Sequence, residues 1–272
     1  MSKIIAVDID GTLLNSKGKI SKKTQKALED ALQEGNIVVI ASGRDPKGVI
    51  QYAEILKLDR YDGLLSNYNG ARITNYNTQE ILINHTLNIS EMKKLLEFSE
   101  DLDINYTIYY DGKCYTNSMD TYKLKDTRSK NNMEIIYDPK LSYNIDFEPN
   151  NVLFACHPDK IEEAIVQIDD SFNDKFTFVK STPYYYEVMP KGIGKGESLL
   201  EIAKYYDIPI EDTIAFGDEE NDLTMIKTAG IGVAMGNATD LVKEAADYIT
   251  LSNDEDGIAD YLEKFILKKE KI

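Results

Sequence analysis

Four aspartates follow two short apolar runs, residues 3–7 and 213–216, that lie far apart in the chain. These aspartates are Asp8, Asp10, Asp218 and Asp222. If the two runs are neighbouring strands of an open parallel sheet, the four acids converge, because ligands of such sheets lie beyond the carboxyl ends of the strands. Carboxylates at close range raise one another's pKa, so an uncompensated cluster would hold protons. A hard divalent cation resolves this, and oxygen ligands with room for waters and a phosphate favour Mg²⁺.

Two further segments carry groups that complement an anion. Ser42, Gly43 and Arg44 follow another expected strand, where a hydroxyl and backbone N–H groups before a helix can hold phosphate oxygens. Lys195 lies in the glycine-rich stretch 192–196 at the entrance to an expected helix, so its ammonium can face the same crevice. Together these segments supply the positive potential that the four aspartates lack.

The elements that must position these residues alternate between short apolar strands and amphipathic helices. The N-terminal part predicts strands at 3–7, 37–40 and 63–65, a helix at 22–34 capped by Ser21, and a hairpin at 72–76 and 80–84. The C-terminal part predicts helices at 198–206, from Glu219, at 239–246 and at 257–267, with strands at 213–216, 230–234 and 248–250. This alternation predicts an α/β fold in which helices cover both faces of a Rossmann-like parallel sheet.

The middle of the chain has a different pattern of expected helices and strands. We expect helices at 90–102 and 161–168, strands at 104–110, 151–156 and 176–179, and one further strand at 133–137 within a polar stretch. The parallel-sheet domain is therefore predicted to consist of residues 1–84 and 184–272, with an α+β domain inserted at 85–183. Such insertions are tolerated because the ends of a domain tend to lie near one another on its surface.

Composition excludes several classes of protein. The chain has 31 basic and 47 acidic residues and a net charge of −16, which disfavours a duplex-DNA binder or a polybasic membrane-surface protein. No apolar run reaches membrane length. Cys114 and Cys156 are expected to be buried free thiols of a cytoplasmic protein. Neither His85 nor His157 belongs to a zinc-binding pattern. Nothing in the sequence specifies an oligomeric state.

The segments that carry these candidate site residues resemble a known family. They match, in order, the four motifs of the haloacid dehalogenase superfamily, and they lie at 8–14, 42–44, 195 and 217–222. The chain is most similar to the Cof-type phosphatases of this superfamily, whose cap domain is inserted between the second and third motifs. Residues 69–71 and 232–238 also resemble that subgroup. The resemblance implies a Rossmann-like core with an inserted α+β cap and a phosphatase that acts on small phosphorylated metabolites.

The resemblance also implies a role for each aspartate. Asp8 would attack phosphorus and form an aspartyl phosphate, which splits one difficult step into two. Asp10 would protonate the leaving alkoxide and later deprotonate the hydrolytic water. Asp8, the Asp10 carbonyl and Asp218 would bind Mg²⁺ together with a phosphate oxygen and waters. Asp222 would support these metal ligands without binding the ion itself.

The remaining site residues would contact the phosphoryl group. The resemblance implies that Ser42, the Gly43 N–H and Lys195 stabilise its equatorial oxygens as charge redistributes. Asn221 would lie on the phosphate side of the same helix face as Asp218. Arg44 is as compatible with a surface ion pair as with a contact to substrate or cap.

Each segment by itself also has a plainer interpretation. The stretch after Asp8 could be a simple turn. A calcium loop is excluded, because Leu13 and Lys19 stand where such a loop needs Gly and Glu. Lys195 is followed by Gly196, not by the Ser or Thr of a Walker loop. Asp218 could merely cap a helix. The ordered occurrence of all four segments at expected strand ends favours the catalytic interpretation.

Two other functions remain open from the sequence. A sugar phosphomutase would use Asp8 similarly but return the phosphoryl group to the sugar. A non-catalytic protein that binds phosphorylated metabolites would keep the pocket without turnover, although such a protein would be expected to lack Asp8 or Asp10, and both are present. The substrate itself is not specified, because sugar phosphates, nucleotides, flavin mononucleotide and pyridoxal phosphate all fit the chemistry.

Overall fold

The chain forms two compact units, which are treated separately below. The computed structural model describes residues 2–125 and 133–267. The first unit consists of Met1–Ile83 and Gly194–Ile272, and the second of Asn84–Ile193. The second boundary, expected after residue 183, lies instead after Ile193. The reason is strand pairing, because β11 (Tyr185–Pro190) is an interior strand of the second sheet, between its β9 and β10.

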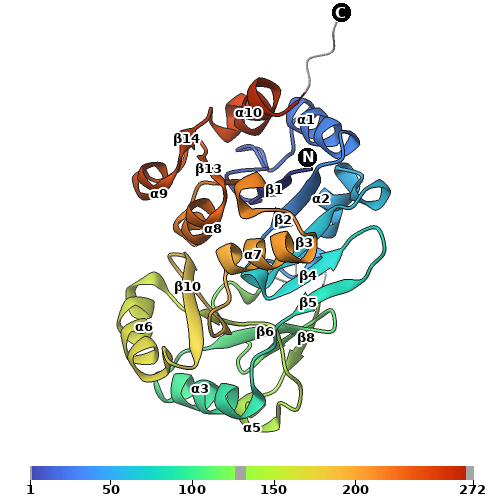
Figure 1. Cartoon of the computed structure of the whole chain (residues 1–272). Helices are drawn as coiled ribbons and strands as arrows, with labels where there is room; N and C mark the ends of the chain where they lie inside the picture. The colour runs from blue at the N-terminus through green and yellow to red at the C-terminus, as the bar shows by residue number, and fades with distance from the viewer. Residues whose placement is uncertain (1, 126–132, 268–272) are drawn as a thin grey trace, which may run out of the picture. The chain divides into compact units, whose positions relative to one another are not determined.

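The first unit is built on a mostly parallel sheet of eight strands (Figure 1). In spatial order the strands are β14 (Tyr248–Ile249), β13 (Ile231–Ala234), β12 (Thr213–Gly217), β1 (Ile4–Val7), β2 (Ile37–Ala41), β3 (Leu64–Asn67), β4 (Arg72–Asn75) and β5 (Ile81–Asn84). The strands from β14 to β3 are parallel, and β4 is antiparallel to β3. Every residue of β1, β2 and β12 is buried, as expected for strands covered on both faces.

Helices cover both sides of this sheet, and the predicted fold class is confirmed. The main helices are α1 (Lys22–Gln33), α2 (Ile50–Ile55), α7 (Lys195–Tyr205), α8 (Leu223–Thr228), α9 (Asp240–Ala245) and α10 (Gly257–Phe265). Figure 1 shows α1 and α10 together on one side of the sheet and α7 with α8 on the other. Helix α7 begins at Lys195, three residues earlier than the sequence predicts, so the lysine is its first residue.

The second unit is an α+β arrangement with its own core. Its strands, in spatial order, are β10 (Phe176–Thr182), β11, β9 (Val152–Ala155), β6 (Tyr106–Tyr110), β7 (Lys113–Thr116) and β8 (Glu134–Tyr137). Its helices include α3 (Ile89–Asp101), α5 (Leu141–Asn144) and α6 (Pro158–Phe172). Tyr106, Phe154 and Val188 of the sheet pack with Leu95 of α3 and Ile161 of α6. The core is therefore separate from that of the parallel sheet.

Strand β7 is not among the elements predicted from the sequence. Its signal is the dipeptide Asp111-Gly112, which joins β6 to β7 in a two-residue hairpin. Both residues have positive φ, 47° and 70°, as the tight hairpin turns that favour Asp-Gly require. Cys114 on this strand and Cys156 are both buried, and neither forms a disulfide, as predicted. Among the described residues, no helix combines the length and apolar character needed to cross a membrane.

Helix α1 begins with the side-chain cap that the sequence predicts. The Ser21 hydroxyl accepts a hydrogen bond from the Thr24 N–H at 3.0 Å. We expect Ser21→Ala to lower the free energy of unfolding by about 1 kcal/mol, because the N–H loses its partner. Urea denaturation measures this change. Ser21→Asp keeps an acceptor and should remain close to the parent, whereas an unchanged midpoint for Ser21→Ala would contradict the role of the cap.

Candidate active site

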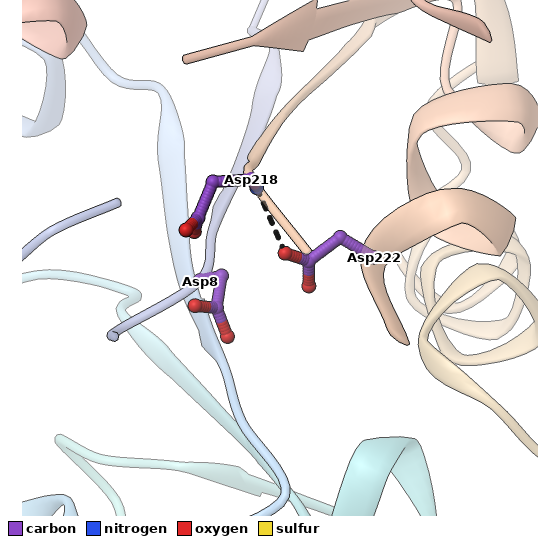
Figure 2. A group of neighbouring side chains, drawn as sticks. All are labelled: Asp8, Asp218 and Asp222. Atoms are coloured by element: carbon purple, nitrogen blue, oxygen red, sulfur yellow. Dashed lines mark hydrogen bonds between the residues drawn. The ribbon is translucent and has the colours of Figure 1, made fainter. Parts of the chain in front are cut away.

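Asp8 and Asp218 meet because their strands are neighbours. Strand β1 pairs in parallel with β12, with Val7 opposite Phe216, so the residues after the two strands lie at the same edge of the sheet. Carboxylate oxygens of Asp8, Asp218 and Asp222 all lie within 4.8 Å of one another (Figure 2). All three side chains are buried, with Asp8 7%, Asp218 6% and Asp222 0% exposed.

Lys195 provides the positive charge within this acidic group. Its Nζ lies 2.5 Å from Asp8 Oδ1 and 2.6 Å from Asp222 Oδ1, and the residue is only 1% exposed. A buried ammonium is tolerated here because it has two carboxylate partners. The lysine can reach both because α7 begins at this residue.

The loop after β1 is held directly against Asp218. The Thr12 hydroxyl donates to Asp218 Oδ1 at 2.6 Å. Gly11 has a φ of +83°, and a Cβ at this position would lie 2.0 Å from Asp218 Oδ2. Any larger residue at position 11 would therefore displace the carboxylate. The loop is also tied to a distant segment, since Asn237 Nδ2 donates to the Gly11 carbonyl at 2.9 Å.

Asp222 supports Asp218 by a route that differs from the prediction. The sequence predicts a helix from Glu219 with Asp218, Asn221 and Asp222 on one face. Instead, a 3₁₀ turn (Glu220–Asp222) comes first, and α8 begins only at Leu223. The Asp222 carboxylate folds back, and its Oδ2 accepts the Asp218 N–H at 3.0 Å, as the dashed line in Figure 2 shows.

The residue that caps this turn is also not the one considered from the sequence. Glu219 is the N-cap, and its side chain and that of Asp222 form a reciprocal capping box. Asp218 is therefore released from any capping role and presents its carboxylate to Asp8 and Thr12. Asn221 is half-buried in the same turn.

Arg44 forms an ion pair with Asp10. Its Nη2 lies 2.6 Å and 2.7 Å from the two oxygens of the Asp10 carboxylate, whose side chain is 67% exposed. The guanidinium is also near the Tyr52 hydroxyl, with Nη1 at 3.3 Å. Asp10 is thus the exposed carboxylate of the site, and Arg44 orients it.

The phosphate-binding segment expected after β2 adopts a compact loop. Ser42 is 3% exposed, and its hydroxyl accepts the Arg44 N–H at 3.2 Å. Gly43 between them is half-buried. The structure thus places all nine site residues predicted from the sequence in the first unit, at or next to the carboxyl ends of β1, β2 and β12 or at the start of α7.

Burial and mutual repulsion shift the pKa of two aspartates upward. Burial, then the charge of Asp222, raises the pKa of Asp8 to about 7, although Lys195 opposes the shift. Burial raises the pKa of Asp218 to about 8 in spite of the Thr12 hydrogen bond, and the charges of Asp8 and Asp222 add to it. Burial by itself would lower the pKa of Lys195, but Asp222 and Asp8 outweigh it and raise that pKa. One ammonium therefore does not neutralise three carboxylates.

These residues fit a divalent cation. The donors that converge are carboxylate oxygens, which are the ligands of hard cations such as Mg²⁺. Both oxygens of Asp222 already accept hydrogen bonds, from Lys195 and from backbone N–H groups, so Asp8 and Asp218 are the better ligands. Added positive charge between these two would relieve the repulsion that raises their pKa values.

Thr12 and Asn237 are two residues of the site to which the sequence analysis gave no role. Thr12 lies in the first motif, four residues after Asp8, and Asn237 lies in the stretch 232–238 that resembles the Cof-type subgroup. Both stabilise the site through contacts across the chain, with partners more than two hundred residues away. Such partners are not visible in local sequence patterns.

Comparisons with known proteins agree with this geometry. The sequence matches the haloacid dehalogenase-like hydrolase family over residues 5–262. It is 34% identical over 267 residues to the 5-amino-6-(5-phospho-D-ribitylamino)uracil phosphatase YcsE of Bacillus subtilis strain 168, covering 97% of this chain and 96% of that protein. A haloacid dehalogenase-like hydrolase from Bacteroides thetaiotaomicron, 33% identical, superposes with a TM-score of 0.87 and covers 98% of this chain and 100% of its own.

A third protein has a named class of substrate. It is the sugar phosphatase BT4131, of subclass IIB of the superfamily, which is 27% identical, with a TM-score of 0.82 over 98% of this chain and 100% of its own. The family expected from the four motifs is therefore confirmed. This chain belongs to the haloacid dehalogenase-like hydrolase family and is a phosphatase with a parallel-sheet core and an inserted α+β domain.

Proposed function

We propose that this phosphatase is Mg²⁺-dependent and hydrolyses small phosphorylated metabolites, such as sugar phosphates, through an aspartyl phosphate on Asp8. The observation that carries the proposal is the buried position of Asp8, with Lys195 Nζ at 2.5 Å and Asp218 beside it. A nucleophilic carboxylate needs to be ionised and shielded from repulsion by an incoming phosphate. Lys195 favours the ionised form of Asp8 without fully offsetting its burial. A cation held by Asp8, the Asp10 carbonyl and Asp218 would complete that stabilisation and supply the shielding charge.

In this proposal the two aspartates of the first loop divide the chemistry between them. An Asp8 oxygen forms a bond to phosphorus while the ester oxygen leaves with a proton from Asp10. A water then gives its proton to Asp10 as its oxygen attacks phosphorus, which releases inorganic phosphate and restores Asp8. Arg44 orients Asp10 through its ion pair with that carboxylate. Ser42, the Gly43 N–H, Lys195 and Asn221 contact the phosphoryl group in this scheme.

The substrate class rests on similarity. The relatives described above act on a phosphorylated ribityl compound and on sugar phosphates, both of which are small phosphomonoesters. We infer that the second unit is the cap that selects among such compounds, since the phosphorus chemistry is complete within the first unit. The two buried cysteines, which form no disulfide, suit a cytoplasmic setting.

A panel of phosphorylated metabolites tests the substrate class. We expect release of inorganic phosphate, with the highest kcat/KM on sugar phosphates or similar polyhydroxylated phosphomonoesters. Free phosphate and the dephosphorylated compound are measured together. Formation of an isomeric sugar phosphate would instead identify a phosphomutase, and binding without turnover would identify a non-catalytic protein.

Asp8→Asn tests the nucleophile. The amide cannot attack phosphorus, so we expect hydrolysis of p-nitrophenyl phosphate to fall to background while circular dichroism stays that of the parent. Asp30→Asn is the matched control, because Asp30 pairs with Lys26 on the surface of α1, outside the site. Full activity in Asp8→Asn would remove Asp8 from the nucleophilic role.

The dependence of stability on pH tests the cation. The unfolded chain titrates Asp8 and Asp218 near 3.8, whereas the metal-free folded protein titrates them at about 7 and about 8. Between these values the folded state binds more protons, so stability should fall as the pH rises from about 4 to about 8. Because Mg²⁺ binds the ionised carboxylates, it should raise Tm more at the upper end of this window than at the lower end.

Differential scanning fluorimetry with EDTA or Mg²⁺ measures both effects. Chelation should also stop turnover until Mg²⁺ is restored. Asp218→Asn removes one ligand and one titrating group, so it should reduce both the pH dependence and the stabilisation by Mg²⁺. Stabilisation independent of pH, or turnover in EDTA, would contradict the assignment of Mg²⁺ to this cluster.

A further inference from the structure

The segment Ser66–Gly70 has an unusual backbone conformation. It runs from the end of β3 into the turn that follows this strand. Tyr68, Asn69 and Gly70 all have positive φ, at 54°, 52° and 102°. Residues other than glycine rarely adopt this region, and two of them in succession are costly. Strained backbone of this kind persists only where its surroundings hold it in place, and it concentrates at functional sites. Asn69 and Gly70 also belong to the stretch that resembles the Cof-type subgroup.

One side of this segment holds the loop of Ser42 and Arg44. The Ser42 carbonyl accepts the Asn69 N–H at 3.0 Å, and the Arg44 carbonyl accepts the Tyr68 N–H at 3.2 Å. The Asn67 side chain adds a third bond, from Nδ2 to the Arg44 carbonyl at 3.1 Å. Because Tyr68 and Asn69 are left-handed, consecutive N–H groups of this segment can reach the same loop.

The other side of the segment touches the start of α7. A Cβ on Gly70 would lie 2.6 Å from the Gly194 carbonyl oxygen and 2.6 Å from Ser198 Cβ. The Ser198 hydroxyl donates to the Lys195 carbonyl at 2.9 Å, so the Ser66 hydroxyl, 3.2 Å away, is left to donate to Ser198. Ser66 is 0% exposed. These contacts fix the backbone of Lys195.

We propose that Ser66–Gly70 is a positioning segment that sets the separation between the Ser42–Arg44 loop and Lys195, so that both contact one phosphoryl group. The proposal rests on the function proposed above. It adds that no residue of the segment contacts the phosphate itself. Two groups from different elements must meet the same anion. This segment is hydrogen-bonded to the backbone of the Ser42–Arg44 loop and reaches the Lys195 carbonyl through the Ser198 hydroxyl. A misplacement of about 1 Å between such groups can reduce the rate by a factor of about 100.

Two variants test the segment from opposite directions. Gly70→Ala pushes the start of α7 away, whereas Ser66→Ala only removes the hydroxyl that donates to Ser198. With p-nitrophenyl phosphate, we expect kcat/KM to fall by about 10- to 100-fold in Gly70→Ala and by less in Ser66→Ala. The inhibition constant of inorganic phosphate should rise in both, because phosphate no longer meets Ser42 and Lys195 together.

Gly230→Ala is the matched control. Its Cβ would lie 2.4 Å from the Glu211 carbonyl oxygen, a comparable clash with backbone, but Gly230 precedes β13 at the opposite edge of the sheet from the site. We expect it to lower Tm and leave the inhibition constant of phosphate unchanged. If Gly230→Ala weakened phosphate binding as much as Gly70→Ala does for a similar loss of Tm, the segment would have only a structural role and the proposal would be wrong.

A double-mutant cycle with Lys195→Met gives the decisive readout. If Gly70 acts through the placement of Lys195, Gly70→Ala should reduce phosphate binding much less once the ammonium is gone. Fully additive effects would overturn the proposal, as would parental kinetics and phosphate inhibition in Gly70→Ala. If Gly70→Ala fails to fold, Ser66→Ala decides in its place, in both the single variant and the cycle. Absence of hydrolysis by the parent protein would count against the proposed function instead.

Discussion

Repulsion among three buried carboxylates is the constraint on which this site depends. Asp8, Asp218 and Asp222 lie within 4.8 Å of one another, at an edge of the sheet where little water reaches them. Lys195 offsets part of this repulsion, yet the pKa values of Asp8 and Asp218 remain raised to about 7 and about 8. Additional positive charge at this point would therefore stabilise the ionised carboxylates. The cation proposed above would supply that charge.

The surrounding loops hold these charges where chain entropy and repulsion would separate them. Gly11 leaves space for the Asp218 carboxylate, and Thr12 donates to it. Asp222 accepts backbone N–H groups with one oxygen and Lys195 with the other. Bonds of this kind to a charged acceptor are stronger than neutral ones, which helps to offset the cost of burying the acids. The geometry of the site is thus a property of the loops as much as of the strands.

Local patterns predicted most of the elements, and the errors have physical causes. The helix after Ser21 is confirmed because capping and amphipathic spacing are local. Strand β7 was not predicted because four residues give too little alternation, although Asp111-Gly112 was an available signal. The boundary after residue 183 was misplaced because β11 pairs with strands of the second sheet, and pairing partners are set by contacts distant in sequence. The turn after Asp218 begins as 3₁₀ because Asp222 bonds to backbone N–H groups that a helix face would have left free.

The sequence by itself determined the chemistry of this protein, because the types and order of its motif residues limit what their side chains can do. Carboxylates, a lysine and a loop with hydroxyl and N–H donors are the groups that phosphoryl chemistry uses, and their order in the chain resembles a phosphatase family. Only the tertiary structure decided how they meet. Pairing of β1 with β12 brings Asp8 to Asp218, and α7 begins at Lys195. The left-handed residues Tyr68 and Asn69 donate their N–H groups to carbonyls of the Ser42–Arg44 loop. These contacts join segments that are far apart in the chain, and their free energy comes from packing and burial that exist only in the folded state.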